Sequence, residues 1–224
     1  MVLLGISISV SAQTKAVIIE KGKAINDTLF NNRLFFLKNF VDCRITLKNG
    51  SIYDAKANIM TIDQYVVIIV GGDTLRASRE NEIATFSGGG AFLYKIDGDY
   101  HQVVESDGEL SLAMTKAINF EGEKLAGAYG GSNETSAISK VSRKSISVEN
   151  GWAWTDENRV EMKYRYKESL YLILNGKRYI ATKKNFERMF PRRKADITRF
   201  IDDNNVQMSN NSDVIDLFKY LVQN

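Results

Sequence analysis

Hydrophobic and polar residues alternate with a period of two along most of the first 181 residues. The alternating runs are short, and turn dipeptides such as Asn49-Gly50, Asp97-Gly98 and Asn175-Gly176 separate them. Turns this frequent between β-rich runs are typical of antiparallel hairpins rather than of parallel strands joined by helices. The pattern predicts strands over residues 15–20, 41–48, 51–58, 64–70, 74–78, 82–87, 91–96, 99–105, 109–117, 144–149, 152–155, 158–167, 169–174 and 177–181.

The turn at Asn49-Gly50 also allows a strand register to be predicted. A two-residue loop would pair Ile45 with Asp54 and would mix apolar with polar positions. A three-residue loop with Gly50 in the left-handed region pairs Ile45 with Tyr53 instead, and Cys43 with Ala55. We therefore predict a G1-bulge turn. In this register Cys43 lies on the apolar face of its strand, and we interpret it as a small buried hydrophobe rather than a reactive thiol.

The periodicity becomes helical after Ala181. Thr182 is a candidate N-cap, and Pro191 stands where a second helical run begins, a position that favours proline. A final helix is predicted from near Ser212. Its apolar residues follow the i, i+3, i+4, i+7 spacing of one helix face: Val214, Leu217, Phe218 and Leu221. We predict a helical subdomain over residues 182–224 that packs against the sheet.

These patterns predict an α+β fold, mainly antiparallel β. A sheet, sandwich or barrel-like β body is expected over residues 13–181, followed by the small C-terminal helical subdomain. Residues 121–145 contain several glycines and few large apolar residues, so we expect a flexible loop or linker there.

The first residues resemble the end of a secretory signal peptide. An apolar run over residues 2–10 is followed by small residues, and Val10 and Ala12 occupy positions −3 and −1 of a cut before Gln13. Residues 1–12 are therefore interpreted as a signal-peptide remnant, with a buried first strand as the alternative. The run is too short to span a bilayer.

Composition and charge exclude several kinds of chemistry. The chain has 224 residues, 30 Lys and Arg against 27 Asp and Glu, one His and one Cys. A His-based zinc cage, a Cys₄ site and an intramolecular disulfide are excluded by this count. We interpret His101 as a packed or exposed strand residue. The three glycines at 88–90 lack the spacing of a phosphate-binding loop, so we interpret them as a connection between strands. The sequence indicates no catalytic residue, metal ligand or cofactor.

Two features remain as candidate binding sites. If a two-residue turn closes at Asn150-Gly151, Trp152 and Trp154 stand on the more polar face of a hairpin, where indoles stack on sugars or fill a partner's pocket. A longer loop reverses the faces and buries them.

The second candidate is a basic run that could bind phosphates, anionic headgroups or acidic glycans. The alternative is an ordinary solvated helix surface. Nucleic acid would also require aromatic platforms, so it is not the expected partner. The candidate anion-binding residues are Lys183, Lys184, Arg188, Arg192, Arg193 and Lys194.

Several segments together resemble a widespread group of uncharacterised exported proteins of Gram-negative bacteria. They are F-V-x-C-x-I-x-L-K-N-G-x-x-Y-D-A-K-x-N at 40–58, GGDTL at 71–75, the stretch at 171–208 and DVIDLFKYL at 213–221. The resemblance supports export, and it implies no catalytic residue because the motifs are packing and turn motifs.

We therefore expect an exported protein, periplasmic, outer-membrane-associated or secreted, with a non-enzymatic binding or structural role. Its expected partner is an envelope protein, a glycan or an anionic surface, and it is not expected to span a membrane. Two alternatives stay open: a carboxylate-dependent hydrolase acting on envelope polymers, and an intracellular basic protein that binds nucleic acid.

Overall fold

The computed structural model describes residues 14–19, 26–125, 146–147, 153–154 and 160–223. The predicted signal-peptide remnant and most of the predicted 121–145 loop therefore lie outside the described residues. The strands are β1 (Lys15–Ile19), β2 (Val41–Leu47), β3 (Ile52–Met60), β4 (Tyr65–Val70), β5 (Asp73–Arg76), β6 (Ile83–Gly88), β7 (Ala91–Ile96), β8 (Asp99–Asp107), β9 (Leu110–Leu125), β10 (Ile146–Ser147), β11 (Ala153–Trp154), β12 (Val160–Leu174) and β13 (Lys177–Ile180). The helices are η1 (Asp27–Phe30), η2 (Glu80–Glu82), α1 (Lys183–Met189), η4 (Pro191–Arg193), α2 (Lys194–Asp203) and α3 (Asn211–Gln223).

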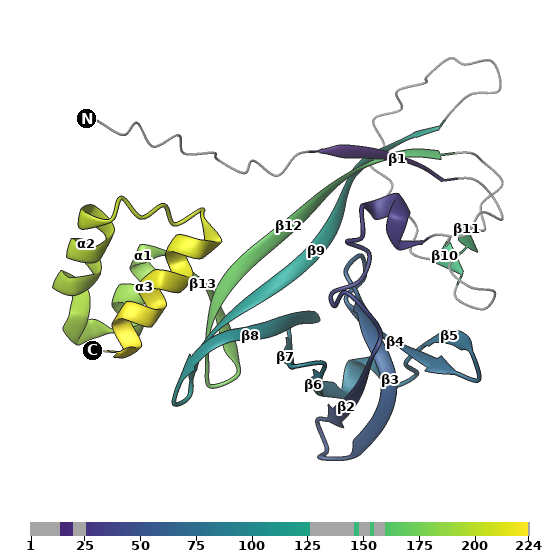
Figure 1. The fold of residues 1–224 in the computed structure, drawn as a ribbon, viewed down its shortest axis with the longest axis horizontal. Coiled ribbons are helices and arrows are strands. Elements are labelled where there is room, and N and C mark those ends of the chain that lie inside the picture. Colours follow the sequence, from purple (N-terminus) through teal and green to yellow (C-terminus); the bar gives the residue numbers. More distant parts are fainter. Residues whose placement is uncertain (1–13, 20–25, 126–145, 148–152, 155–159, 224) are drawn as a thin grey trace. The chain divides into compact units, whose positions relative to one another are not determined.

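Eleven of these strands form one sheet, in the order β1-β12-β9-β8-β7-β6-β2-β3-β4-β5, with β13 pairing with β12. Every strand register that the structure defines is antiparallel, and the three α-helices follow at the C-terminal end of the chain (Figure 1). The α+β prediction is therefore confirmed. Over the described residues the sheet is open, with β1 and β5 as its outer strands.

The β2–β3 hairpin has the predicted register. Ile45 pairs with Tyr53 and Cys43 with Ala55. Gly50 has a φ of 86°, and its N–H donates to the carbonyl of Leu47 over 2.9 Å. The predicted G1-bulge turn is confirmed, and the apolar face of β2 points into the core because of it.

Two strands are longer than the sequence pattern indicates. β12 runs without a break through Lys167 and Glu168, where the polar residues indicate a boundary between two strands. β9 continues to Leu125, which includes the first residues of the expected loop. In both cases the extended backbone continues across residues that do not show apolar alternation in the sequence.

The chain divides into two compact units. The larger unit comprises Thr14–Val103 and Met114–Glu168. One of its two hydrophobic clusters is formed mainly by strands β2 to β8. The buried members of this cluster are Phe36, Cys43, Ile45, Leu47, Ala57, Ile59, Val66, Ile83, Phe86, Ala91, Leu93 and Tyr100.

The second hydrophobic cluster of the larger unit contains residues from β1, η1, β3, β4, β9 and β12. Phe30 from η1 lies edge-on against Tyr164 of β12, with ring centroids 5.2 Å apart. The short helix η1, which sequence patterning did not predict, is capped by Asn26, whose side chain accepts from the N–H of Leu29. The buried members of this second cluster are Val17, Ile19, Phe30, Leu34, Met60, Tyr65, Val67, Ile118, Met162 and Tyr164.

The smaller unit joins Val104–Ala113 to Ser169–Asn224 and contains all three α-helices. Thr182 caps α1 as predicted, accepting from the N–H of Asn185 over 3.4 Å. Pro191 begins η4, and the four residues of the predicted α3 stripe are all buried. Lys219 of α3 pairs with Glu105 of β8 at 3.2 Å. Helix α3 thus buries the face that the spacing predicts.

Candidate functional site

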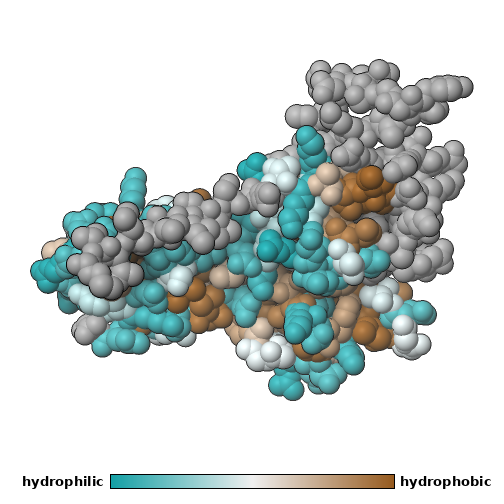
Figure 2. All heavy atoms as spheres, turned by 45° about the horizontal axis from the view of Figure 1, so that its top comes forward, coloured by the Kyte–Doolittle hydropathy of each residue, from teal (hydrophilic) through white to brown (hydrophobic). Residues whose placement is uncertain are grey.

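The predicted basic residues lie on α1, η4 and the start of α2. Lys184 and Arg188 are exposed and lie one helical turn apart, and Arg192 and Lys194 are exposed as well. Lys183 is half-buried. On the face drawn in Figure 2, both hydrophilic and hydrophobic residues are visible on the helical part of the chain. We call Lys183, Lys184, Arg188, Arg192 and Lys194 the basic helical surface.

Arg193 differs from the other residues of the predicted patch. Its Nε donates to Asp196 Oδ2 over 3.1 Å, and its NH1 donates to the carbonyl of Leu221 at the end of α3. The guanidinium also lies 5.2 Å from the ring centroid of Tyr220. A cation at a helix C-terminus compensates carbonyls that have no partner within the helix. Arg193 therefore joins α2 to α3.

This difference predicts opposite behaviour for two neighbouring arginines. Arg193→Gln should lower the free energy of unfolding by about 1–3 kcal/mol, because charged hydrogen bonds to the α3 carbonyls are lost. Arg192→Gln is the matched control and should leave stability unchanged, since Arg192 is exposed. Urea unfolding measures both, and equal midpoints for the two variants would contradict the assignment.

The ring of Tyr179 in β13 lies against the guanidinium of Arg188. The Arg188 guanidinium carbon lies 5.1 Å from the Tyr179 ring centroid. This stacking restricts the guanidinium while leaving the residue exposed. Arg188 is thus held in place at the surface, where its charge remains accessible to an anion.

The described residues include one of the two candidate tryptophans. Trp152 lies outside them, and Trp154 belongs to the short strand β11. The backbone register pairs Ile146 with Trp154 and Ser147 with Ala153. A two-residue turn would instead pair Ser147 with Trp154, so the register predicted from a two-residue turn is wrong.

His101 and Cys43 both lie in the interior of the larger unit. The Nδ1 atom of His101 is 2.6 Å from Oγ1 of Thr115, and both residues are buried. The Cys43 thiol donates to the carbonyl of Ala55 over 3.2 Å. Burial raises the pKa of the Cys43 thiol to about 11. Both residues therefore have structural surroundings, as the sequence interpretation expects.

The raised pKa of Cys43 makes a measurable prediction. At pH 8 the thiolate fraction should be about a hundredfold lower in the folded protein than in the unfolded chain, so a disulfide reagent should label native Cys43 slowly. Because folding favours the neutral thiol, its stabilising contribution is present below pH 9 and is lost between pH 9 and about 11. Equal labelling rates in buffer and in guanidinium would contradict this.

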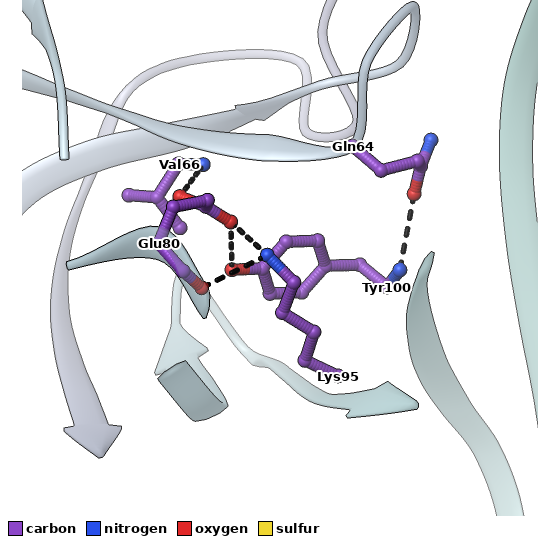
Figure 3. A network of polar contacts seen from close by, with 5 residues as sticks. All are labelled: Gln64, Val66, Glu80, Lys95 and Tyr100. Carbon is purple, nitrogen blue, oxygen red and sulfur yellow. Dashed lines mark hydrogen bonds and ion pairs between the residues drawn. The ribbon is translucent and has the colours of Figure 1, made fainter. Parts of the chain in front are cut away.

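A buried polar network in the larger unit was not predicted from the sequence. The Glu80 carboxylate of η2 accepts from the N–H of Val66 over 2.8 Å and from the hydroxyl of Tyr100 over 2.9 Å. The Lys95 ammonium of β7 pairs with the same carboxylate and lies 4.8 Å from the Tyr100 ring centroid. Figure 3 shows these groups pointing toward one another. The Glu80 and Lys95 side chains are each only 8% exposed.

Gln64 extends the polar contacts toward β9. Its Oε1 accepts from the N–H of Tyr100 over 3.0 Å (Figure 3). Its Nε2 donates to the carbonyls of Thr61 and Lys116 over 3.1 and 2.8 Å. The side-chain amide thus connects the β3–β4 turn with β8 and β9. All of these partners belong to the protein itself, so the network joins strands and leaves its carboxylate fully engaged.

One signal in the sequence could have found part of this network. Ala91, Leu93 and Lys95 alternate along β7, and the first two are buried. Lys95 is therefore on the buried face, where an ammonium requires a partner. Its partner Glu80 could not be identified in this way, because the segment around it has the composition of an ordinary polar loop.

The described residues contain no cluster of three or more His, Cys, Asp or Glu side chains that could hold a metal ion. None of the helices in the described ranges is long and apolar enough to cross a membrane.

Burial raises the pKa of the Tyr100 hydroxyl above its ordinary value, and the adjacent Glu80 carboxylate adds to this effect. Tyr100 therefore remains a hydrogen-bond donor within the network.

Comparison with known proteins identifies no relative. No protein family, no curated protein and no solved structure matches this chain.

Proposed function

We propose that this chain is an exported, non-enzymatic binding protein that recognises an anionic component of the bacterial envelope through its basic helical surface. The observation that carries the proposal is the exposure of Lys184, Arg188, Arg192 and Lys194 on consecutive turns of the C-terminal helices. Between residues 183 and 199 seven basic residues stand against Glu187 and Asp196. Such a local excess attracts anionic ligands even though the whole chain has a net charge of only +3.

Export is supported by the apolar N-terminal run with its small residues at −3 and −1, and by the resemblance to exported Gram-negative proteins. The buried Glu80 carboxylate does not favour the hydrolase alternative, because its contacts are with Val66, Lys95 and Tyr100. A general acid or base must instead be able to reach a substrate.

Binding is tested with beads that carry dextran sulfate, a polymer with dense negative charge. The full chain should bind and should be released by salt, because screening weakens contacts between exposed charges. The double variant Lys184→Gln/Arg188→Gln should bind less tightly, and its thermal unfolding should match that of the wild type. Binding that is unaffected by this charge removal would contradict the proposed surface.

Export is tested by fractionating the producing cells and determining the protein's N-terminus by mass spectrometry. A chain that begins at Gln13 in the periplasm, outer membrane or medium supports the proposal. An uncut chain in the cytoplasm would overturn it.

A further inference from the structure

The smaller unit has an exposed apolar residue immediately before its basic helices. Ile180, the last residue of β13, is 61% exposed. Among the large hydrophobic residues of the described ranges, it has the highest exposed fraction. Its carbonyl accepts from the N–H of Thr182 and from Nδ2 of Asn185, both over 2.8 Å. Ile180 is thereby held beside the first turn of α1, which contains Lys183 and Lys184.

Aromatic and basic side chains accompany Ile180 on its face of the hairpin. Tyr171 of β12 pairs directly with Ile180, so the two side chains are on the same side. Arg178 is also on this face, and its guanidinium carbon lies 5.5 Å from the Tyr171 ring centroid. Both Tyr171 and Arg178 are half-buried. We call Tyr171, Arg178 and Ile180 the β13 face.

This composition matches the requirements of a charged bilayer surface. Lysine and arginine are attracted to anionic headgroups, tyrosine is favoured at the boundary between headgroups and acyl chains, and an exposed aliphatic side chain gains by leaving water. A dissolved acidic polymer offers the charges but no apolar layer, so it would leave Ile180 in water. The apolar residue therefore distinguishes two ligands that the basic residues alone do not.

We infer that the β13 face and the adjacent Lys183 and Lys184 dock on the surface of an anionic phospholipid bilayer, with Ile180 entering the headgroup boundary. The inference rests on the proposed function and specifies its ligand. Charge complementarity supplies the attraction, and burial of Ile180 supplies a contribution that salt does not screen.

The experiment compares the full chain with three variants on two kinds of vesicle and on dextran sulfate beads. The vesicles consist of phosphatidylethanolamine with phosphatidylglycerol, or of phosphatidylcholine alone. The variants are Ile180→Ser, Lys183→Gln/Lys184→Gln and Ile52→Ser. Ile52 is the matched control, because it is 55% exposed on β3 in the larger unit. Thermal unfolding verifies that each variant is folded.

The wild type should sediment with phosphatidylglycerol vesicles and not with phosphatidylcholine vesicles. Ile180→Ser should weaken vesicle binding roughly tenfold and leave bead binding unchanged, since only the bilayer buries the isoleucine. The lysine variant should weaken both, roughly fivefold for each charge on vesicles. Ile52→Ser should change neither.

Two results would overturn the inference in distinguishable ways. If Ile180→Ser binds vesicles as tightly as the wild type while the lysine variant does not, the protein recognises negative charge alone, and only the bilayer assignment fails. If the wild type binds neither phosphatidylglycerol vesicles nor beads, the proposed function fails together with the inference.

Discussion

Replacing Glu80 with alanine should lower the free energy of unfolding by about 3–5 kcal/mol, the range observed when one partner of a buried ion pair is removed. The Lys95 ammonium would remain 92% buried without its carboxylate partner. The N–H of Val66 and the hydroxyl of Tyr100 would lose their acceptor as well. Urea unfolding followed by tryptophan fluorescence and circular dichroism measures the change.

Glu82 provides the matched control in the same short helix. Its carboxylate pairs with Arg79, but both side chains are about half exposed. Exposed ion pairs contribute little to stability, so Glu82→Ala should leave the unfolding midpoint close to that of the wild type. If Glu80→Ala and Glu82→Ala are equally stable, the buried network does not stabilise the larger unit.

A double-mutant cycle separates the ion pair from the other contacts of Glu80. Lys95→Met keeps the length of the side chain and removes the ammonium. The double variant Glu80→Ala/Lys95→Met should be destabilised by less than the sum of the two single variants, because no uncompensated charge is left buried. Strict additivity would show that the carboxylate acts only through Val66 and Tyr100.

Gly88→Ala should be destabilised by about 3 kcal/mol or more, at or beyond the upper end of the usual range for overpacking. A Cβ atom at this position would lie 2.5 Å from Cys43 Cβ and 2.6 Å from the carbonyl oxygen of Asp42. These atoms belong to the paired strand β2 and cannot rotate away. The β2–β6 pairing would therefore have to shift, and thermal unfolding should show a much lower Tm.

Gly108→Asn is the control for this substitution. Gly108 has a φ of 56° and open space around its potential Cβ. Asparagine tolerates this left-handed conformation better than other side chains, so the variant should remain close to the wild type in Tm. A Gly88→Ala protein as stable as Gly108→Asn would show that β2 and β6 do not approach as closely as described.

The local architecture of the chain follows from the sequence because its causes are local. The left-handed conformation of Gly50 and the alternation around Cys43 are enough to define the β2–β3 register. The Thr182 cap and the buried α3 stripe likewise depend on residues within a few turns of one another. The continuity of β12 through Lys167 and Glu168 was not predicted, because two consecutive polar residues indicate a boundary between strands.

For the candidate site, the sequence predicted which basic residues are present but not how each of them is placed. The basic residues of the C-terminal helices are visible in the sequence, but the special position of Arg193 depends on carbonyls about 28 residues away. The exposure of Ile180 also depends on the tertiary structure, because Ile173 in the paired strand is buried while Ile180 is 61% exposed. Neither relation is expressed in the spacing of neighbouring residues.

The sequence by itself determined most of the strands, the hairpin turn at Gly50 and the apolar stripe of α3, because backbone conformation and residue periodicity act over short distances. Only the tertiary structure decided which of two chemically identical neighbours is buried and paired and which is exposed. Glu80 is buried against Lys95 while Glu82 is exposed, and Arg193 holds α3 while Arg192 is exposed. The physical reason is that desolvation and pairing of a charge depend on groups brought together by folding, whatever their separation along the chain.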